Sequence, residues 1–102
     1  MKVVIIGMGV QGIKRKNILK KDFLYSVDKF KKADFKNIKD VPLKKYDTVF
    51  ICVPDNQKYN LANFCLKNNK NVLIEKPLIF KNQKLYSNLK KMAEKRNLAF
   101  YT

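Results

Sequence analysis

Histidine is absent from the 102 residues, which excludes imidazole as a metal ligand or general base, and we expect no metal site. Cysteine is limited to Cys52 and Cys65, which form no C-x-x-C pair and lie inside apolar runs. Such thiols are typically buried and reduced, which favours a cytoplasmic protein. Long apolar runs are also missing, because Val3–Ile6 near the start is too short for a signal peptide or a membrane span. We therefore expect a soluble protein with no membrane partner.

Arginine and acidic residues are scarce, although the chain is strongly basic. Only Arg15 and Arg96 are arginine among 23 basic residues, and 8 acidic residues leave a net charge of +15. Such a charge suggests a nucleic-acid binder, but proteins that read phosphates and bases favour arginine, whose planar fork binds them bidentately. Here the lysines are spread over every predicted helix. We expect a solvated basic surface, a weak salt-sensitive attraction to polyanions, and no specific nucleic-acid partner.

The chain is long enough for one domain with a core, since 46% of its residues are apolar. Short apolar runs alternate with amphipathic stretches, which predicts an α/β fold: a parallel sheet with helices on both faces. The predicted strands are Val3–Ile6, Phe23–Val27, Thr48–Val53, Val72–Ile74 and Leu98–Tyr101. The predicted helices are Val10–Lys21, Gln57–Asn68 and Asn82–Arg96. Their predicted inward residues are Val10, Ile13 and Ile18 in the first, Leu61, Ala62, Cys65 and Leu66 in the second, and Leu85, Leu89, Met92 and Ala93 in the third.

The segment Lys29–Tyr46 is too short for the helix and strand that would normally follow the second strand. We predict a short edge strand at Ala33–Lys36 and a brief helix at Ile38–Lys45, interrupted at Pro42. The crossover helix is therefore expected to be lost or reduced to a turn. A further turn is expected at Lys67–Lys70, because asparagine tolerates the left-handed conformation that ends many helices.

All three glycines of the chain lie in one loop, Gly7-Met8-Gly9-Val10-Gln11-Gly12, between the first strand and the first helix. Gly7 permits a tight turn, Gly9 lets a pyrophosphate approach the backbone, and Gly12 allows the helix to pack closely on the strand. The diphosphate would then lie at the helix N-terminus, whose unpaired N–H groups favour negative charge. The alternative, a turn that only links two elements, would not need every glycine in the chain. The loop predicts a Rossmann-type dinucleotide-binding domain over residues 1–102.

Asp28 closes the second strand about twenty residues beyond the loop, where an acid hydrogen-bonds the hydroxyls of the adenosine ribose. Its charge repels a 2′-phosphate, which favours NAD as the cofactor. Lys29, Lys31 and Lys32 follow at once and offer positive charge to such a phosphate. NAD is therefore the expected cofactor and NADP stays open, with Asp28 and Lys29 among the cofactor-binding residues.

Two further motifs follow at the ends of later strands. Cys52-Val53-Pro54, with Asn56 close behind it, ends one strand, and Glu75-Lys76-Pro77 ends the next. In an open parallel sheet, ligands bind beyond the C-terminal ends of the strands. Both motifs are therefore expected to line the nicotinamide half of the cofactor site.

With these motifs the chain resembles, over its whole length, the glucose–fructose oxidoreductase and inositol dehydrogenase family (Gfo/Idh/MocA). Glu75-Lys76-Pro77 is the most specific of them. The resemblance implies an NAD(P)-dependent oxidoreductase acting on a secondary alcohol of a sugar, a sugar nucleotide or a cyclitol. It also implies that Lys76 contacts the nicotinamide ribose and the substrate and assists proton transfer, and that Pro77 shapes the turn that aims it.

Two departures from the family pattern limit what the resemblance implies. Members commonly carry histidine four residues after the proline of the Cys52-Val53-Pro54 motif, and this chain has Lys58 there, which puts a nicotinamide contact from that position in doubt. Full-length members also continue into a C-terminal α/β domain that binds substrate and supplies further catalytic residues. We therefore expect a cofactor-binding portion, inactive alone, that can self-associate through an exposed sheet edge or face.

Two other functions stay open at this stage. The missing substrate domain suits a non-catalytic module that binds a dinucleotide to sense or to scaffold. A basic nucleic-acid binder is the third reading, and the low arginine content argues against it. Binding of NADH would distinguish the enzyme portion and the dinucleotide-binding module from a nucleic-acid binder. Turnover with sugar nucleotides would then distinguish the enzyme from the module.

Overall fold

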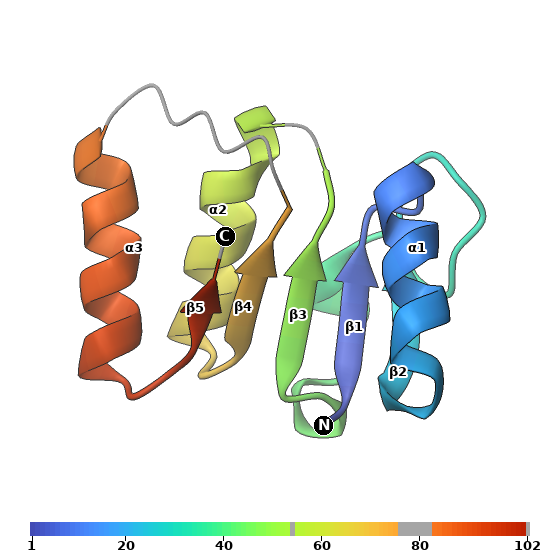
Figure 1. Cartoon of the computed structure of the whole chain (residues 1–102), viewed down its shortest axis with the longest axis horizontal. Helices are drawn as coiled ribbons and strands as arrows, with labels where there is room; N and C mark the ends of the chain where they lie inside the picture. The colour runs from blue at the N-terminus through green and yellow to red at the C-terminus, as the bar shows by residue number, and fades with distance from the viewer. Residues whose placement is uncertain (54, 76–82, 102) are drawn as a thin grey trace.

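The computed structural model describes residues 1–53, 55–75 and 83–101. Five strands in these ranges form one parallel sheet in the order β2-β1-β3-β4-β5, which confirms the predicted α/β fold (Figure 1). The strands are β1 (Val3–Ile6), β2 (Phe23–Val27), β3 (Thr48–Ile51), β4 (Asn71–Ile74) and β5 (Phe100–Tyr101). The helices are α1 (Val10–Leu19), α2 (Asp55–Lys67) and α3 (Gln83–Lys95).

The sheet forms where the sequence places uninterrupted β-branched residues. All four residues of β1 are buried, as expected for a central strand covered on both faces. Figure 1 shows α1 in front of the sheet and α2 behind it, with α3 beside α2 near the β5 edge. The main core lies on the α2 side, where strand residues pack against both helices. Its members include Val4, Ile6, Val49, Ile51, Val72 and Ile74 from the strands and Ala62, Cys65, Leu66, Leu89 and Ala93 from α2 and α3.

The orientation of α1 differs from the prediction. Val10, Ile13 and Ile18 are 72%, 49% and 69% exposed, so their predicted inward orientation is wrong. Gly12 is the buried residue of this helix, and a Cβ atom there would lie 1.9 Å from the carbonyl oxygen of Gly7. Because this approach requires Gly12 to face the strand, the apolar residues on the other sides of the helix turn outward.

The other helices follow the prediction more closely. The predicted inward residues of α2 and α3 are buried, apart from Leu61, Leu85 and Met92, which are half-buried. Asn69 has a φ of 62°, which confirms the left-handed turn after α2. Some element boundaries differ from the prediction. Strand β3 ends before Cys52, and α1 ends at Leu19 and is followed by a 3₁₀ turn, η1 (Lys20–Asp22). Within the described residues, every helix is too short or too polar to span a membrane.

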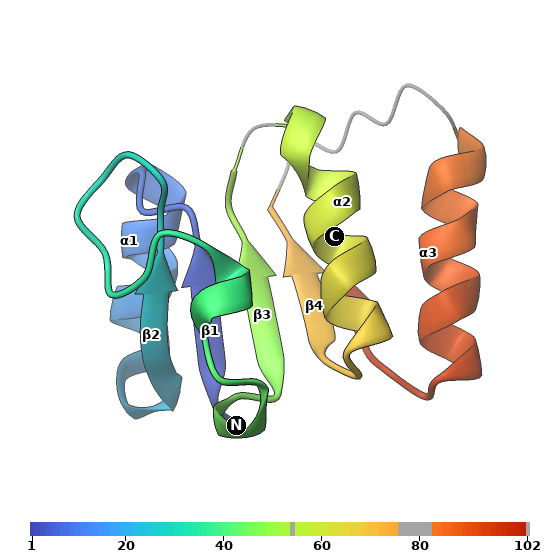
Figure 2. The same ribbon diagram turned by 180° about the vertical axis from the view of Figure 1, so that it is seen from behind.

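The chain between β2 and β3 replaces a crossover helix with turns. The predicted edge strand is reduced to one parallel bridge between Phe35 and Val27. Two 3₁₀ turns, η2 (Ile38–Asp40) and η3 (Leu43–Lys45), flank Pro42, so the expected loss of the helix is confirmed. Figure 2 shows that this segment crosses the sheet on the same face as α2. The segment between β2 and β3 therefore covers less of this face of the sheet than a crossover helix would.

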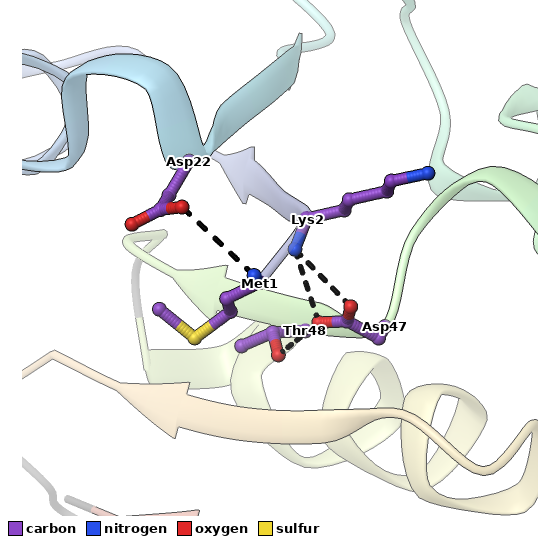
Figure 3. Close-up of polar contacts among 5 residues, drawn as sticks. All are labelled: Met1, Lys2, Asp22, Asp47 and Thr48. Atoms are coloured by element: carbon purple, nitrogen blue, oxygen red, sulfur yellow. Dashed lines mark hydrogen bonds and ion pairs between the residues drawn. The ribbon is translucent and has the colours of Figure 1, made fainter.

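The N-terminal edge of the sheet is tied together by acidic side chains (Figure 3). The carboxylate of Asp47 accepts hydrogen bonds from the Lys2 backbone N–H, at 3.1 and 3.2 Å, and from the Thr48 hydroxyl at 2.7 Å. The terminal ammonium of Met1 lies 3.9 Å from the Asp22 carboxylate. The Asp47 contacts hold the start of β1 against β3, and the Met1 contact holds it near the start of β2, while the glycine loop lies at the opposite, C-terminal ends of the strands.

Candidate cofactor site

A cavity of about 680 Å³ opens at the C-terminal ends of β1 and β3. The chain leaves these neighbouring strands in opposite directions, since β1 leads to β2 and β3 leads to β4. Parallel sheets bind their ligands at such a switch point. Among the site residues predicted from the sequence, the cavity is lined by Gly7, Gly9, Asp28, Lys29, Cys52 and Val53.

The glycine loop has the geometry that its three glycines require. Gly7 has a φ of +98°, and a Cβ atom there would lie 2.5 Å from the carbonyl oxygen of Cys52. Gly12 lies under Gly7, whose carbonyl oxygen leaves no room for a side chain. At Gly9, by contrast, an added Cβ atom would meet nothing within 4 Å. Open space above Gly9 is what a diphosphate needs in order to approach the backbone.

The N-terminus of α1 is free to bind an anion. Gly9 is its N-cap residue, so the cap makes no side-chain hydrogen bond, and the first turn contains no acidic residue. Val10 and Gln11 are exposed at this turn. The first N–H groups of a helix have no intrahelical partner and carry partial positive charge. The loop and the helix end together fit the diphosphate of a dinucleotide.

Asp28 links the glycine loop to the turn after β2. Its Oδ2 accepts a hydrogen bond from Met8 N at 2.8 Å, and its Oδ1 accepts from Phe30 N and Lys31 N at 2.9 Å each. Burial raises the pKa of this carboxyl, but the three hydrogen bonds and the charge of Lys31 outweigh burial and lower the pKa below its usual range. Asp28 is therefore a carboxylate at neutral pH and lines the cavity.

Much of the cavity wall was not predicted from the sequence. Besides Lys29 and Lys31, which the sequence had indicated, lysines contribute to it from the segment after β2 and from α2, namely Lys36, Lys39 and Lys67. Apolar surface comes from Ile38, Leu61 and Phe64, and from Phe30, which is 91% exposed. Lys32, which the sequence placed with Lys29 and Lys31, does not line the cavity within the described part of the chain. These positions depend on the path of the turns and the roll of α2, which no motif encodes.

Of the residues that the sequence assigns to the nicotinamide half, the structure describes Cys52, Val53 and Glu75 but not every one. Pro54, Lys76 and Pro77 lie outside the described residues, as does the side chain of Asn56. Burial, and then the negative charge of Glu75, raises the pKa of the half-buried Cys52 thiol to about 12, with Arg15 and Lys58 opposing the shift. Cys52 is therefore a neutral thiol at the cavity wall.

Glu75 follows β4 and is held by two basic side chains. Arg15 of α1 binds its Oε1 through both Nε and Nη2. Lys58 of α2 is 3% exposed and donates a hydrogen bond from Nζ to the Glu75 backbone oxygen at 2.8 Å. The sequence drew attention to Lys58 but not to Arg15. The signal available for Arg15 was its rarity, since the chain has only two arginines.

The family follows from comparison with known sequences. A family profile described as oxidoreductase family, NAD-binding Rossmann fold (Gfo/Idh/MocA), matches residues 10–102. The chain belongs to this family. The match includes Gly12, Asp28 and Glu75 and begins after Gly7 and Gly9. A search of curated proteins finds no match.

Solved structures of Gfo/Idh/MocA type show the same fold. GenD2 from gentamicin A biosynthesis, solved in complex with NAD, superposes with a TM-score of 0.87 at 20% identity, over 99% of this chain and 33% of its own. D-galactose-1-dehydrogenase from Rhizobium etli gives 0.82 at 20% identity, over 97% and 35%. UDP-N-acetylglucosamine 3-dehydrogenase from Acidithiobacillus ferrooxidans gives 0.76 at 20% identity, over 98% and 37%. The chain thus spans about a third of the length of these relatives.

Proposed function

We propose that residues 1–102 form the cofactor-binding domain of an NAD-dependent oxidoreductase, with the diphosphate of the cofactor above Gly9. The observation that carries this proposal is the open space at Gly9, at an uncapped helix N-terminus and beside the Asp28 carboxylate. A linking turn would not need both a steric cradle and an acid at the end of the adjacent strand.

Each part of the site takes one part of the cofactor in this proposal. The loop from Gly7 to Gly12, with Met8, Val10 and Gln11, holds the diphosphate through backbone N–H groups. Asp28 and Lys29 meet the adenosine ribose, because they lie at the end of β2 in the cavity wall. The residues assigned to the nicotinamide half are Cys52, Val53, Pro54, Asn56, Glu75, Lys76 and Pro77.

The reaction we propose is oxidation of a secondary alcohol on a sugar or sugar nucleotide. Bound NAD would supply the hydride acceptor. Lys76 is proposed to handle the proton of the reacting hydroxyl, because it follows Glu75 in the sequence after β4, and parallel sheets bind ligands beyond the C-terminal ends of their strands. Two of the structural relatives carry sugar substrates in their names, D-galactose and UDP-N-acetylglucosamine, which supports this substrate class. We propose a cytoplasmic location, consistent with two free cysteines.

Titration with NADH tests the proposal directly. The wild-type chain is expected to bind NADH, with a change in nicotinamide fluorescence. Gly9→Ala is expected to fold, since its Cβ meets no neighbour, and to bind at least about tenfold more weakly because the methyl group occupies the diphosphate cradle. Asn17→Ala, at an exposed position of the same helix, is the matched control and should bind normally. Normal binding by Gly9→Ala, or none by the wild type, would contradict the proposal.

Turnover and association are tested separately. We expect the 102-residue chain to bind cofactor without oxidising a panel of sugar nucleotides, because its relatives are about three times as long. Measurable dehydrogenase activity would refute this expectation. We also propose that it self-associates through an exposed sheet edge or face, where Phe50 and Leu73 are half-buried neighbours. A strict monomer in concentrated size-exclusion runs would refute that.

A further inference from the structure

Three elements converge on Glu75, the first residue after β4. Its backbone N–H donates to the Ile51 oxygen of β3 at 2.9 Å, which extends the ladder between the two strands. Its backbone oxygen accepts from Lys58 of α2, and its carboxylate accepts from Arg15 of α1. Glu75 is thus held from both faces of the sheet at once, since α1 and α2 lie on opposite faces (Figure 1).

Lys58 and Glu75 are largely shielded from solvent, whereas Arg15 is partly exposed. Lys58 is almost fully buried, and the side chain of Glu75 is 13% exposed, against 36% for Arg15. The Arg15 guanidinium also lies over the Phe50 ring, 5.9 Å from its centroid, on the α1 face of β3. Buried charges are costly and contribute little net stability unless paired, but well-paired ones can impose one geometry on their partners. The contacts from Arg15 and Lys58 therefore fix the orientation of Glu75.

We infer that Arg15 and Lys58 are positioning residues, which hold Glu75 so that the end of β4 meets the nicotinamide half of the cofactor. The inference rests on the proposed function and assigns a role to the lysine that stands where the family commonly has histidine. Lys58 acts on the backbone of Glu75 and Arg15 acts on its carboxylate. Arg15, Lys58 and Glu75 all lie behind the described cavity wall, so the two basic residues act by fixing the position of Glu75 at the end of β4.

A purely structural role for Arg15 is the competing explanation. Val10, Ile13 and Ile18 of α1 face solvent, so the ion pair with Glu75 could serve only to fasten this helix to the sheet. In that case loss of Arg15 would move the N-terminus of α1, and every ligand with a diphosphate would bind more weakly. The two explanations therefore differ in which part of the cofactor loses affinity.

The test compares NADH with ADP, which shares the adenosine and the diphosphate but lacks the nicotinamide ribose and ring. Arg15→Gln, Glu75→Gln and Lys58→Met are each expected to weaken NADH binding about fivefold or more and ADP binding by less than about twofold. Arg15→Lys, which keeps the charge but not the planar fork, should give a smaller NADH loss than Arg15→Gln. Lys14→Gln on α1 and Lys91→Met on α3 remove exposed charges and should bind like the wild type.

A double variant shows whether the pair acts as a unit. Arg15→Gln combined with Glu75→Gln should lose no more NADH affinity than the larger single loss, because each substitution breaks the same contact. Lys58→Met is the variant at risk of misfolding, and the half-exposed Arg15 and the isosteric Glu75→Gln keep the test open if it does. Equal losses for NADH and ADP, or unchanged NADH binding, would overturn the positioning role while leaving the proposed function intact. A wild-type chain that binds neither ligand would overturn both.

Discussion

At the scale of single residues, the three glycines of the loop are needed for different reasons. Gly9 leaves space for a ligand, whereas Gly7 and Gly12 leave space for the protein backbone itself. Only the latter two are therefore required for folding, and Gly7 also needs glycine for its positive φ. Substitutions at Gly9 should therefore affect ligand binding, whereas substitutions at Gly7 and Gly12 should affect stability.

Gly12→Ala is expected to destabilise the fold, unlike Gly9→Ala. The new methyl group would overlap the Gly7 carbonyl oxygen and force α1 away from β1. We expect the free energy of unfolding to fall by about 3 kcal/mol, the upper range for overpacking, despite alanine's higher helix propensity. Urea denaturation of both variants checks this, and equal stability of the two would show that α1 is not held against Gly7.

The Tyr46 hydroxyl is a second residue-scale case, because it is buried and lacks a hydrogen-bond partner among the described residues. Burial, and then the electrostatic interaction with the Cys65 thiol, raises the pKa of this hydroxyl to about 12. Its ring still packs in the core, with the Lys70 ammonium 4.4 Å from the ring centroid. Tyr46→Phe keeps the ring and removes an unpaired polar group, so stability should stay constant or rise by up to about 1 kcal/mol. A thermal melt showing a clear loss would contradict this.

Both thiols should be unreactive while the protein is folded. Burial raises the pKa of Cys52 and of Cys65 to about 12, against about 8.5 for a free thiol. The folded state therefore keeps both protons, and the stability this gives is fully present below pH 8.5 and declines as the pH rises toward 12. At pH 8.5 we expect slow alkylation by iodoacetamide in buffer and rapid alkylation in urea. Equal rates would show that the thiols are accessible in the native state.

At the scale of elements, α1 contributes less to the main core than α2 and α3 do. It contributes Gly12 to the close contact with β1 and Arg15 to Glu75, while Val10, Ile13 and Ile18 face solvent. By contrast, α2 and α3 supply core residues such as Leu66 and Leu89. The stability of the domain should therefore depend on α2 far more than on the outer face of α1.

Substitutions on the two helices measure this difference. Ile18→Gln on α1 is expected to change the free energy of unfolding by less than about 0.5 kcal/mol, since the side chain is exposed. Leu66→Ala on α2 is expected to lower it by about 3 kcal/mol, because the side chain is fully buried. Chemical denaturation of both variants gives the comparison. A loss above about 1 kcal/mol for Ile18→Gln would reveal that this face of α1 is covered in solution.

Which elements could be predicted from the sequence depended on how local the signal was. Strand β1 and the stripe of α2 were predicted because runs and periodicity report burial directly. Periodicity failed for α1, since it identified an apolar face but not which face meets the sheet. Gly12 held that information: Leu19, two turns further along the helix, shares its face and is half-buried. The contacts of Arg15 and Lys58 with Glu75 join distant segments and leave no pattern in the sequence.

At the scale of the whole molecule, the charge is uneven around the cofactor site. The net charge of +15 is mostly dispersed, yet five of the described residues that line the cavity are lysines. Asp28 is the acidic residue among the described lining residues, and its lowered pKa keeps it ionised. A 2′-phosphate would thus meet repulsion from one carboxylate close by and attraction from several lysines around it. The repulsion from Asp28 acts over a shorter distance than the attraction from the lysines, so salt should screen the attraction more strongly.

The choice between NADH and NADPH should therefore depend on ionic strength. Salt screens charges more strongly as their separation grows, with a Debye length of about 10 Å at 0.1 M and about 30 Å at 0.01 M. At high salt we expect NADH to bind more tightly than NADPH, because the repulsion between Asp28 and the 2′-phosphate of NADPH acts at short range and is screened least. Lowering the salt should strengthen NADPH binding more than NADH binding, since the extra negative charge of NADPH is attracted by the lysines.

Lys39→Gln, which removes a charge from the cavity wall, should reduce this difference in salt dependence, whereas Lys91→Gln on the exposed side of α3 should not. Parallel salt dependences for the two cofactors in the wild type would show that the cavity lysines do not act on the 2′ position.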